Sequence, residues 1–71
     1  MAKATLKVNG MSCEHCVKSV TDALMRTDGV SKAKVNLKKG EAHVNFDESK
    51  VTVAQLGQAI TDAGYEFVSA K

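Results

Sequence analysis

Two cysteines, the only ones in the chain, are separated by two residues in the run Gly10-Met11-Ser12-Cys13-Glu14-His15-Cys16. The hydrophobic pattern places this run between a strand and a helix, so both sulfurs are expected near the start of a helix. The unpaired N–H groups and the positive end of the helix dipole favour thiolate over thiol there, and a thiolate is a good ligand for a soft cation. The spacing and the placement therefore predict a soft-metal site formed by Cys13 and Cys16.

Other chemistries also use a cysteine pair of this kind. A structural zinc site needs four ligands, and the only further candidates are His15 and His43. His15 lies between the sulfurs and His43 is expected on the outer face of a strand, so these positions argue against a zinc site. Haem attachment needs a histidine directly after the second cysteine; this chain has Val17 there, which argues against haem. A thiol–disulfide redox role stays open because a dithiol at a helix start suits it, although the chain has no proline for the cis-proline loop of a thioredoxin fold.

Length and composition limit the class of protein. The 71 residues are expected to form one domain, residues 1–71, and 44% hydrophobic with 25% charged residues is typical of a soluble globular protein. The N-terminal run lacks a secretory signal, and no apolar run approaches the roughly 20 residues that span a bilayer. We therefore expect no membrane insertion and a cytoplasmic, reducing location. A net charge of +2, with one Tyr and two Phe, argues against nucleic-acid binding.

Four strands and two helices are predicted to position the sulfurs. Apolar and polar residues alternate around Leu6 and Val8 and in residues 32–38 and 42–46, and residues 65–69 can form a last strand. Helical spacing predicts one helix over roughly 14–27, followed by Gly29, and another over 53–63, followed by Gly64. The order βαββαβ with right-handed crossovers gives an α+β fold, a ferredoxin-like sandwich with a four-stranded antiparallel sheet and two helices on one face.

This topology also predicts the neighbours of the cysteines. Three loops share one end of such a sheet, and they are formed by residues 10–16, 38–40 and 63–65. Tyr65 and either Lys38 or Lys39 are therefore expected beside the sulfurs, although all three are distant in sequence.

Four residues are candidates for supporting roles. Met11 can act as a thioether ligand, but a flexible apolar side chain beside a loop more often packs inward, and we expect packing. His15 is expected to be a solvated loop residue, although it can tune the local charge or bind metal when two copies pair. Ser12 is expected to cap the helix. Tyr65 can hydrogen-bond or shield the sulfurs, and it can equally anchor the edge of the core.

The run at residues 10–16 resembles the Gly-Met-x-Cys-x-x-Cys loop of the heavy-metal-associated (HMA) domain family. The resemblance extends nearly end to end, and it includes Val17, Asp28-Gly29-Val30, Val35-Asn36-Leu37, Val44-Asn45-Phe46-Asp47 and Ala63-Gly64-Tyr65. Within the family, the chain is most similar to the bacterial CopZ-type copper chaperones.

The resemblance implies a carrier rather than an enzyme, with Cu(I) bound by Cys13 and Cys16 and delivered to the N-terminal metal-binding domain of a copper-transporting P-type ATPase. Two thiolates at this spacing can hold soft Cu(I) in a near-linear site that stays accessible, so that a partner thiolate adds before a donor thiolate leaves. The chain without metal is expected to be a monomer, and a copper-bridged dimer is a further possibility for the metal-bound form. A thiol–disulfide redox protein and a carrier of another soft metal such as Hg(II) remain the alternatives.

Overall fold

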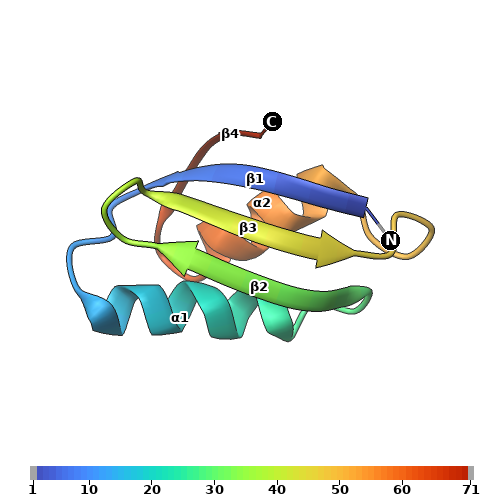
Figure 1. Ribbon diagram of the computed structural model, residues 1–71, viewed down its shortest axis with the longest axis horizontal. Coiled ribbons are helices and arrows are strands. Elements are labelled where there is room, and N and C mark those ends of the chain that lie inside the picture. Colours follow the sequence, from blue (N-terminus) through green and yellow to red (C-terminus); the bar gives the residue numbers. More distant parts are fainter. Residues whose placement is uncertain (1, 71) are drawn as a thin grey trace.

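The computed structural model describes residues 2–70, which form six regular elements. In chain order these are β1 (Ala2–Asn9), α1 (Glu14–Met25), β2 (Val30–Asn36), β3 (Glu41–Phe46), α2 (Val53–Asp62) and β4 (Glu66–Ala70). The strands form one antiparallel sheet in the order β2-β3-β1-β4, and the two helices pack on it (Figure 1). The predicted ferredoxin-like βαββαβ sandwich is confirmed. Neither of these helices has the length and apolar character needed to cross a bilayer.

The hydrophobic core lies between the sheet and the helices. Alternate residues of β1 and β3 point into it, and each helix contributes one apolar stripe. The largest fully buried side chains are Leu6, Leu24, Leu56, Ile60, Val8, Val20 and Val44. Burying a side chain of this size contributes about 1.5–3 kcal/mol, so this layer of contacts holds both helices on the sheet.

The turn after α2 places Tyr65 at the end of the sheet where α1 begins. Gly64 adopts a positive φ of 98°, and the N–H of Tyr65 donates to the carbonyl of Ile60 at 3.2 Å. This pattern is typical of a glycine-terminated helix, in which the turning chain satisfies the last carbonyls. The helix itself lies close to β4 because position 57 is glycine: a Cβ there would be 2.5 Å from Cδ2 of Phe67.

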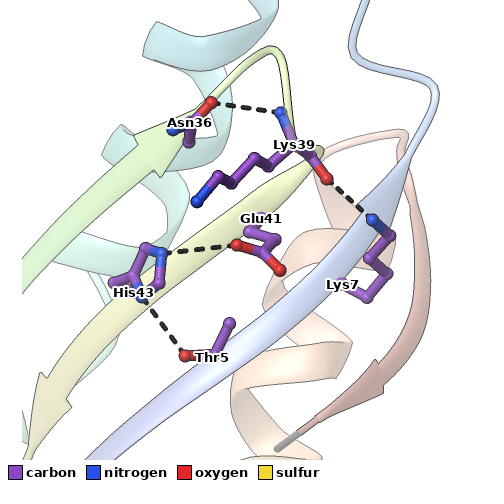
Figure 2. A network of polar contacts seen from close by, with 6 residues as sticks. All are labelled: Thr5, Lys7, Asn36, Lys39, Glu41 and His43. Atoms are coloured by element: carbon purple, nitrogen blue, oxygen red, sulfur yellow. Dashed lines mark hydrogen bonds and ion pairs between the residues drawn. The ribbon is translucent and has the colours of Figure 1, made fainter.

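The β2–β3 hairpin turn is tied to β1 by hydrogen bonds. Lys7 Nζ donates to the carbonyl of Lys39 at 2.7 Å, and the Lys39 N–H donates to Asn36 Oδ1 at 3.1 Å (Figure 2). The N–H of Val8 also donates to the carbonyl of Gly40 at 2.8 Å. The hairpin turn and the segment between β1 and α1 therefore lie at the same end of the molecule (Figure 1).

Several element boundaries differ by one or two residues from the sequence prediction; strand β2, for example, covers Val30–Asn36 rather than residues 32–38. Helix α1 ends at Met25 rather than near residue 27, because Arg26 is its C-cap and the Thr27 hydroxyl donates back to the carbonyl of Ala23 at 3.1 Å. Strand β4 begins at Glu66 rather than Tyr65, because the N–H of Tyr65 is already used by the turn that ends α2.

Changing valine to alanine should lower the free energy of unfolding by different amounts at a buried and at an exposed position. Val20 on α1 is completely buried and Val68 on β4 is 50% exposed. Val20→Ala should lower the free energy of unfolding by about 2–3 kcal/mol, because it loses buried methyl groups and leaves a cavity. Val68→Ala should cost less than about 1 kcal/mol. Urea unfolding of both reduced variants measures the difference, and equal losses would contradict this description of the core.

Candidate metal centre

Cys13 and Cys16 lie at the start of α1 with their sulfur atoms 3.5 Å apart. Cys13 is the N-cap residue, with extended backbone (φ −157°, ψ 172°), and its carbonyl accepts the N–H of Cys16 at 3.0 Å and that of Val17 at 3.2 Å. Residues three apart at a helix start lie on the same face, which brings the two side chains together. Both thiols are free, with Cys13 exposed and Cys16 half-buried.

The surroundings of Cys16 favour its thiolate. Its pKa is lowered from the ordinary 9.0 to about 6, first by the backbone N–H of Ser12 and then by the Tyr65 hydroxyl and the Cys13 thiol. The backbone N–H of Cys13 adds to the effect, and partial burial opposes it. Successive N–H groups in a turn form a small anion-binding concavity, and here the anion is the sulfur itself. At neutral pH Cys16 is therefore mostly in the form that binds soft metals.

Tyr65 packs against the core, and its hydroxyl acts on the pKa of Cys16. Its ring packs against the core and lies over Gly10, where a Cβ would be 3.7 Å from Tyr65 Cδ1. Its hydroxyl interacts with Cys16 and with Ser19, and the pKa of Tyr65 is raised, chiefly by the Cys16 sulfur. A raised pKa keeps the phenol protonated, so Tyr65 remains a hydrogen-bond donor to the sulfur over the neutral pH range.

The expectation that Ser12 caps α1 was wrong. The N-cap is Cys13, and no side chain caps the helix start. Ser12 lies one residue too early, and its hydroxyl is 3.9 Å from the Cys16 sulfur instead. The backbone N–H of Ser12, which has the largest effect on the Cys16 pKa, is a contribution that sequence reasoning missed. No residue type signals it, because any non-proline residue in this turn carries the same donor.

Among residues 2–70, no side-chain hydrogen bond joins the other predicted neighbours to a cysteine sulfur. Met11 is partly buried against the core, and His15 is exposed in the first turn of α1 rather than in the preceding loop. Lys38 and Lys39 are exposed in the hairpin turn, and across residues 2–70 no hydrogen bond joins either lysine to a cysteine sulfur. The Lys39 carbonyl is used by the Lys7 ammonium, which ties the turn to β1 instead.

His43 is engaged elsewhere, on the face of the sheet that is opposite the helices. Its Nε2 is 3.6 Å from the Glu41 carboxylate and its Nδ1 is 3.2 Å from the Thr5 hydroxyl (Figure 2). Within the described part of the chain, no three His, Cys, Asp or Glu side chains are grouped closely enough to hold a metal. The site therefore offers two sulfurs rather than the four ligands of a structural zinc centre.

Comparison with known proteins gives matches over almost the full chain. The heavy-metal-associated domain family matches residues 5–66. The copper chaperone CopZ of Staphylococcus aureus (strain bovine RF122 / ET3-1) is 48% identical over 68 residues, which cover 96% of this chain and 100% of that protein. A solved CopZ metallochaperone superimposes with a TM-score of 0.92 at 48% identity, covering 94% of this chain and 100% of that one. A copper binding domain from HMA7, a P-type ATPase, gives a TM-score of 0.94 at 38% identity, covering 100% and 99%.

The thiolate at Cys16 leads to a prediction about pH. In reduced protein without metal, the Cys16 Cβ resonance should titrate with a midpoint near pH 6 in residue-resolved NMR. Tyr65→Phe should raise that midpoint while leaving it below 9.0, because the backbone donor of Ser12 remains. Because the folded pKa lies below the ordinary value, the ionised sulfur stabilises the folded chain fully above pH 9, and this contribution is lost as the pH falls through about 6.

Ser69→Ala serves as the control for this titration, since it removes an exposed hydroxyl from β4. It should leave the Cys16 midpoint unchanged. A midpoint near 9.0 in the unmodified protein, or one that Tyr65→Phe does not move, would contradict the described environment of the sulfur.

Proposed function

The chain belongs to the heavy-metal-associated domain family, and from this premise we propose that it is a metallochaperone that binds Cu(I) through Cys13 and Cys16. The observation that carries the proposal is an accessible pair of sulfurs 3.5 Å apart, one of them with a pKa near 6. Thiolates select soft ions such as Cu(I) over harder divalent ions. The copper chaperone named among its relatives supports copper as the cargo and a carrier rather than an enzyme.

Copper binding requires only a small movement of the two side chains. A metal–thiolate bond is about 2.3 Å long in zinc sites, so two sulfurs in line across an ion of similar bond length would lie about 4.6 Å apart. The sulfurs at 3.5 Å must therefore separate. The exposed Cys13 side chain can rotate into solvent, while the half-buried Cys16 is held by Tyr65 and the turn. Cys16 is thus the anchoring ligand and Cys13 the mobile one.

The difference between the half-buried Cys16 and the exposed Cys13 supports direct handover of the ion. A two-coordinate ion beside an exposed sulfur leaves room for a thiolate of the acceptor to add first. The Cys13 bond then breaks, a second thiolate of the acceptor adds before the Cys16 bond breaks, and the ion is never free in solution. We propose the N-terminal metal-binding domain of a copper-transporting P-type ATPase as the acceptor, and the likeness to a copper binding domain of such an ATPase supports it.

The proposal extends to organisation and location. Residues 1–71 are proposed to act as a single domain of this family, and the chain without metal is proposed to be a monomer. A copper-bridged dimer is proposed as the state in which a second copy takes the acceptor's place. A cytoplasmic location suits this chemistry, because a reducing compartment keeps both thiols free for metal.

A thiol–disulfide redox role is the second candidate, and one observation favours it. The Cys16 thiolate lies 3.5 Å from the Cys13 sulfur, which is a suitable arrangement for disulfide formation. The two functions differ in outcome: a redox protein turns over a disulfide substrate, whereas a carrier takes up one equivalent of copper without turnover.

Removing either sulfur should abolish tight copper binding. Changing residues around a metal's ligands typically costs 10–100-fold in affinity, so losing a ligand should cost more than about 100-fold. Cys13→Ser and Cys16→Ser are therefore expected to lose Cu(I) to a competing chelator at least about 100-fold more readily than the unmodified chain, in an anaerobic titration.

His43→Gln provides the control for this titration, because His43 bonds to Thr5 and Glu41 on the outer face of the sheet. It should retain copper as the unmodified chain does. Unchanged retention in both cysteine variants would refute the assignment of the ligands, and catalytic turnover of a disulfide substrate without copper uptake would favour the redox role.

A further inference from the structure

The outer face of the sheet carries three lysines on β1 and β2, the two strands that flank β3. The strand register places Lys3 of β1 and Lys32 of β2 on either side of Asn45 of β3, in one row across the sheet. In the next row, Lys34 lies directly opposite His43. The lysines and His43 are exposed, and alternation along each strand directs these side chains away from the core.

These five residues line a shallow hollow of about 230 Å³. A second hollow of about 180 Å³ shares Lys3, His43 and Asn45 with it and continues toward Thr5. The lining residues on the middle strand, β3, are His43 and Asn45, and lysines of the strands on either side, β1 and β2, line the same hollow. A ligand in this hollow would meet hydrogen-bond donors from three strands.

The charges of these lysines are not balanced locally. Across residues 2–70, none of Lys3, Lys32 and Lys34 forms an ion pair with a carboxylate. The carboxylate on the outer face of these three strands is Glu41, and it lies 3.6 Å from the His43 ring (Figure 2). The remaining acidic residues belong to the helices, to loops and to β4, and they are Glu14, Asp22, Asp28, Asp47, Glu48, Asp62 and Glu66.

Several cations around one small hollow suit a compact anion with more than one negative charge. Ammonium groups bind phosphate oxygens through charge-assisted hydrogen bonds, and a bound anion would relieve the repulsion between neighbouring lysines. No Phe, Tyr or Trp lines either hollow, so the large aromatic rings on which bases of single-stranded nucleic acids stack are absent among these residues. The geometry points to a binding site for a phosphate group, carried by a small polyphosphate such as pyrophosphate.

This site is separate from the cysteines. Lys3 lies near the start of β1, and the strand then runs to Asn9 before the cysteine segment begins. At about 3.3 Å per residue, the four to six residues from Thr5 or Lys3 to Asn9 place the hollow roughly 13–20 Å from that end of the sheet. A bound phosphate would therefore leave the sulfurs open, and the inference does not depend on the proposed copper function.

The test is a titration of the reduced, isotope-labelled chain with inorganic pyrophosphate, followed by amide NMR shifts. Saturable shifts are expected at residues 3, 32, 34, 43 and 45, and they should weaken as salt is added. The double variant Lys32→Gln/Lys34→Gln should bind about tenfold more weakly or worse. The matched control Lys38→Gln/Lys39→Gln removes the same charge from the hairpin turn and should bind as the unmodified chain does.

A parallel arm identifies the source of the phosphate, using vesicles of phosphatidylcholine with and without phosphatidylglycerol. Binding to pyrophosphate supports a free ligand, and binding that is confined to the phosphatidylglycerol vesicles and lost in Lys32→Gln/Lys34→Gln supports a lipid headgroup. Absence of both, or equal weakening in the two double variants, would overturn the site, because net charge alone would then explain the result. Copper uptake should be unchanged in both variants, so failure here is distinct from failure of the carrier proposal.

Discussion

The chemistry of this protein depends on how a tight turn stabilises the ionised sulfur of Cys16. The backbone N–H of Ser12 and the hydroxyl of Tyr65 both favour the ionised form of Cys16, which lowers its pKa to about 6. The companion sulfur of Cys13 lies exposed at the N-cap. In the proposed site, one sulfur is thus prepared as an anion and the other is exposed, which is the combination that a carrier needs.

The fold supplies this arrangement by bringing two distant segments to one end of the sheet. The glycine turn after β1 and the glycine turn after α2 both have a φ of 98°, at Gly10 and Gly64. The first lets the chain pass beneath the Tyr65 ring, and the second sets that ring at the start of β4. The buried stripes of both helices then fix the distance between these turns, so that core packing and sulfur chemistry are linked.

Much of this could be predicted from the sequence, because the relevant signals are periodic. Alternation around Leu6 and Val8 and the helical spacing of Val20 and Leu24 report directly which faces are buried, and these faces determine the sheet and the helices. The order of elements then predicted that Tyr65 would lie near the cysteines, and the structure places it there.

The features that the sequence could not predict are the contacts of single backbone N–H groups and the directions of long side chains. The N–H of Ser12 acts on Cys16 through the local dihedral angles, whereas the pattern suggested only a side-chain cap. Lys38 and Lys39 share the correct end of the sheet, but the direction of a lysine in a turn is not encoded by topology, and neither bonds to a sulfur among the described residues. The lysine rows of the outer face likewise emerge only once the strand register is known.

The most direct test of the central claim is a transfer experiment in the presence of a competitor. The Cu(I)-loaded chain is mixed with the reduced N-terminal domain of a copper-transporting P-type ATPase and a coloured Cu(I) chelator, and NMR follows the two cysteine loops while absorbance follows the chelator. Direct ligand exchange predicts that copper reaches the acceptor domain faster than the chelator can take it from the loaded chain alone. Transfer that never exceeds the rate of release to the chelator would show that the ion passes through solution, and it would contradict the account.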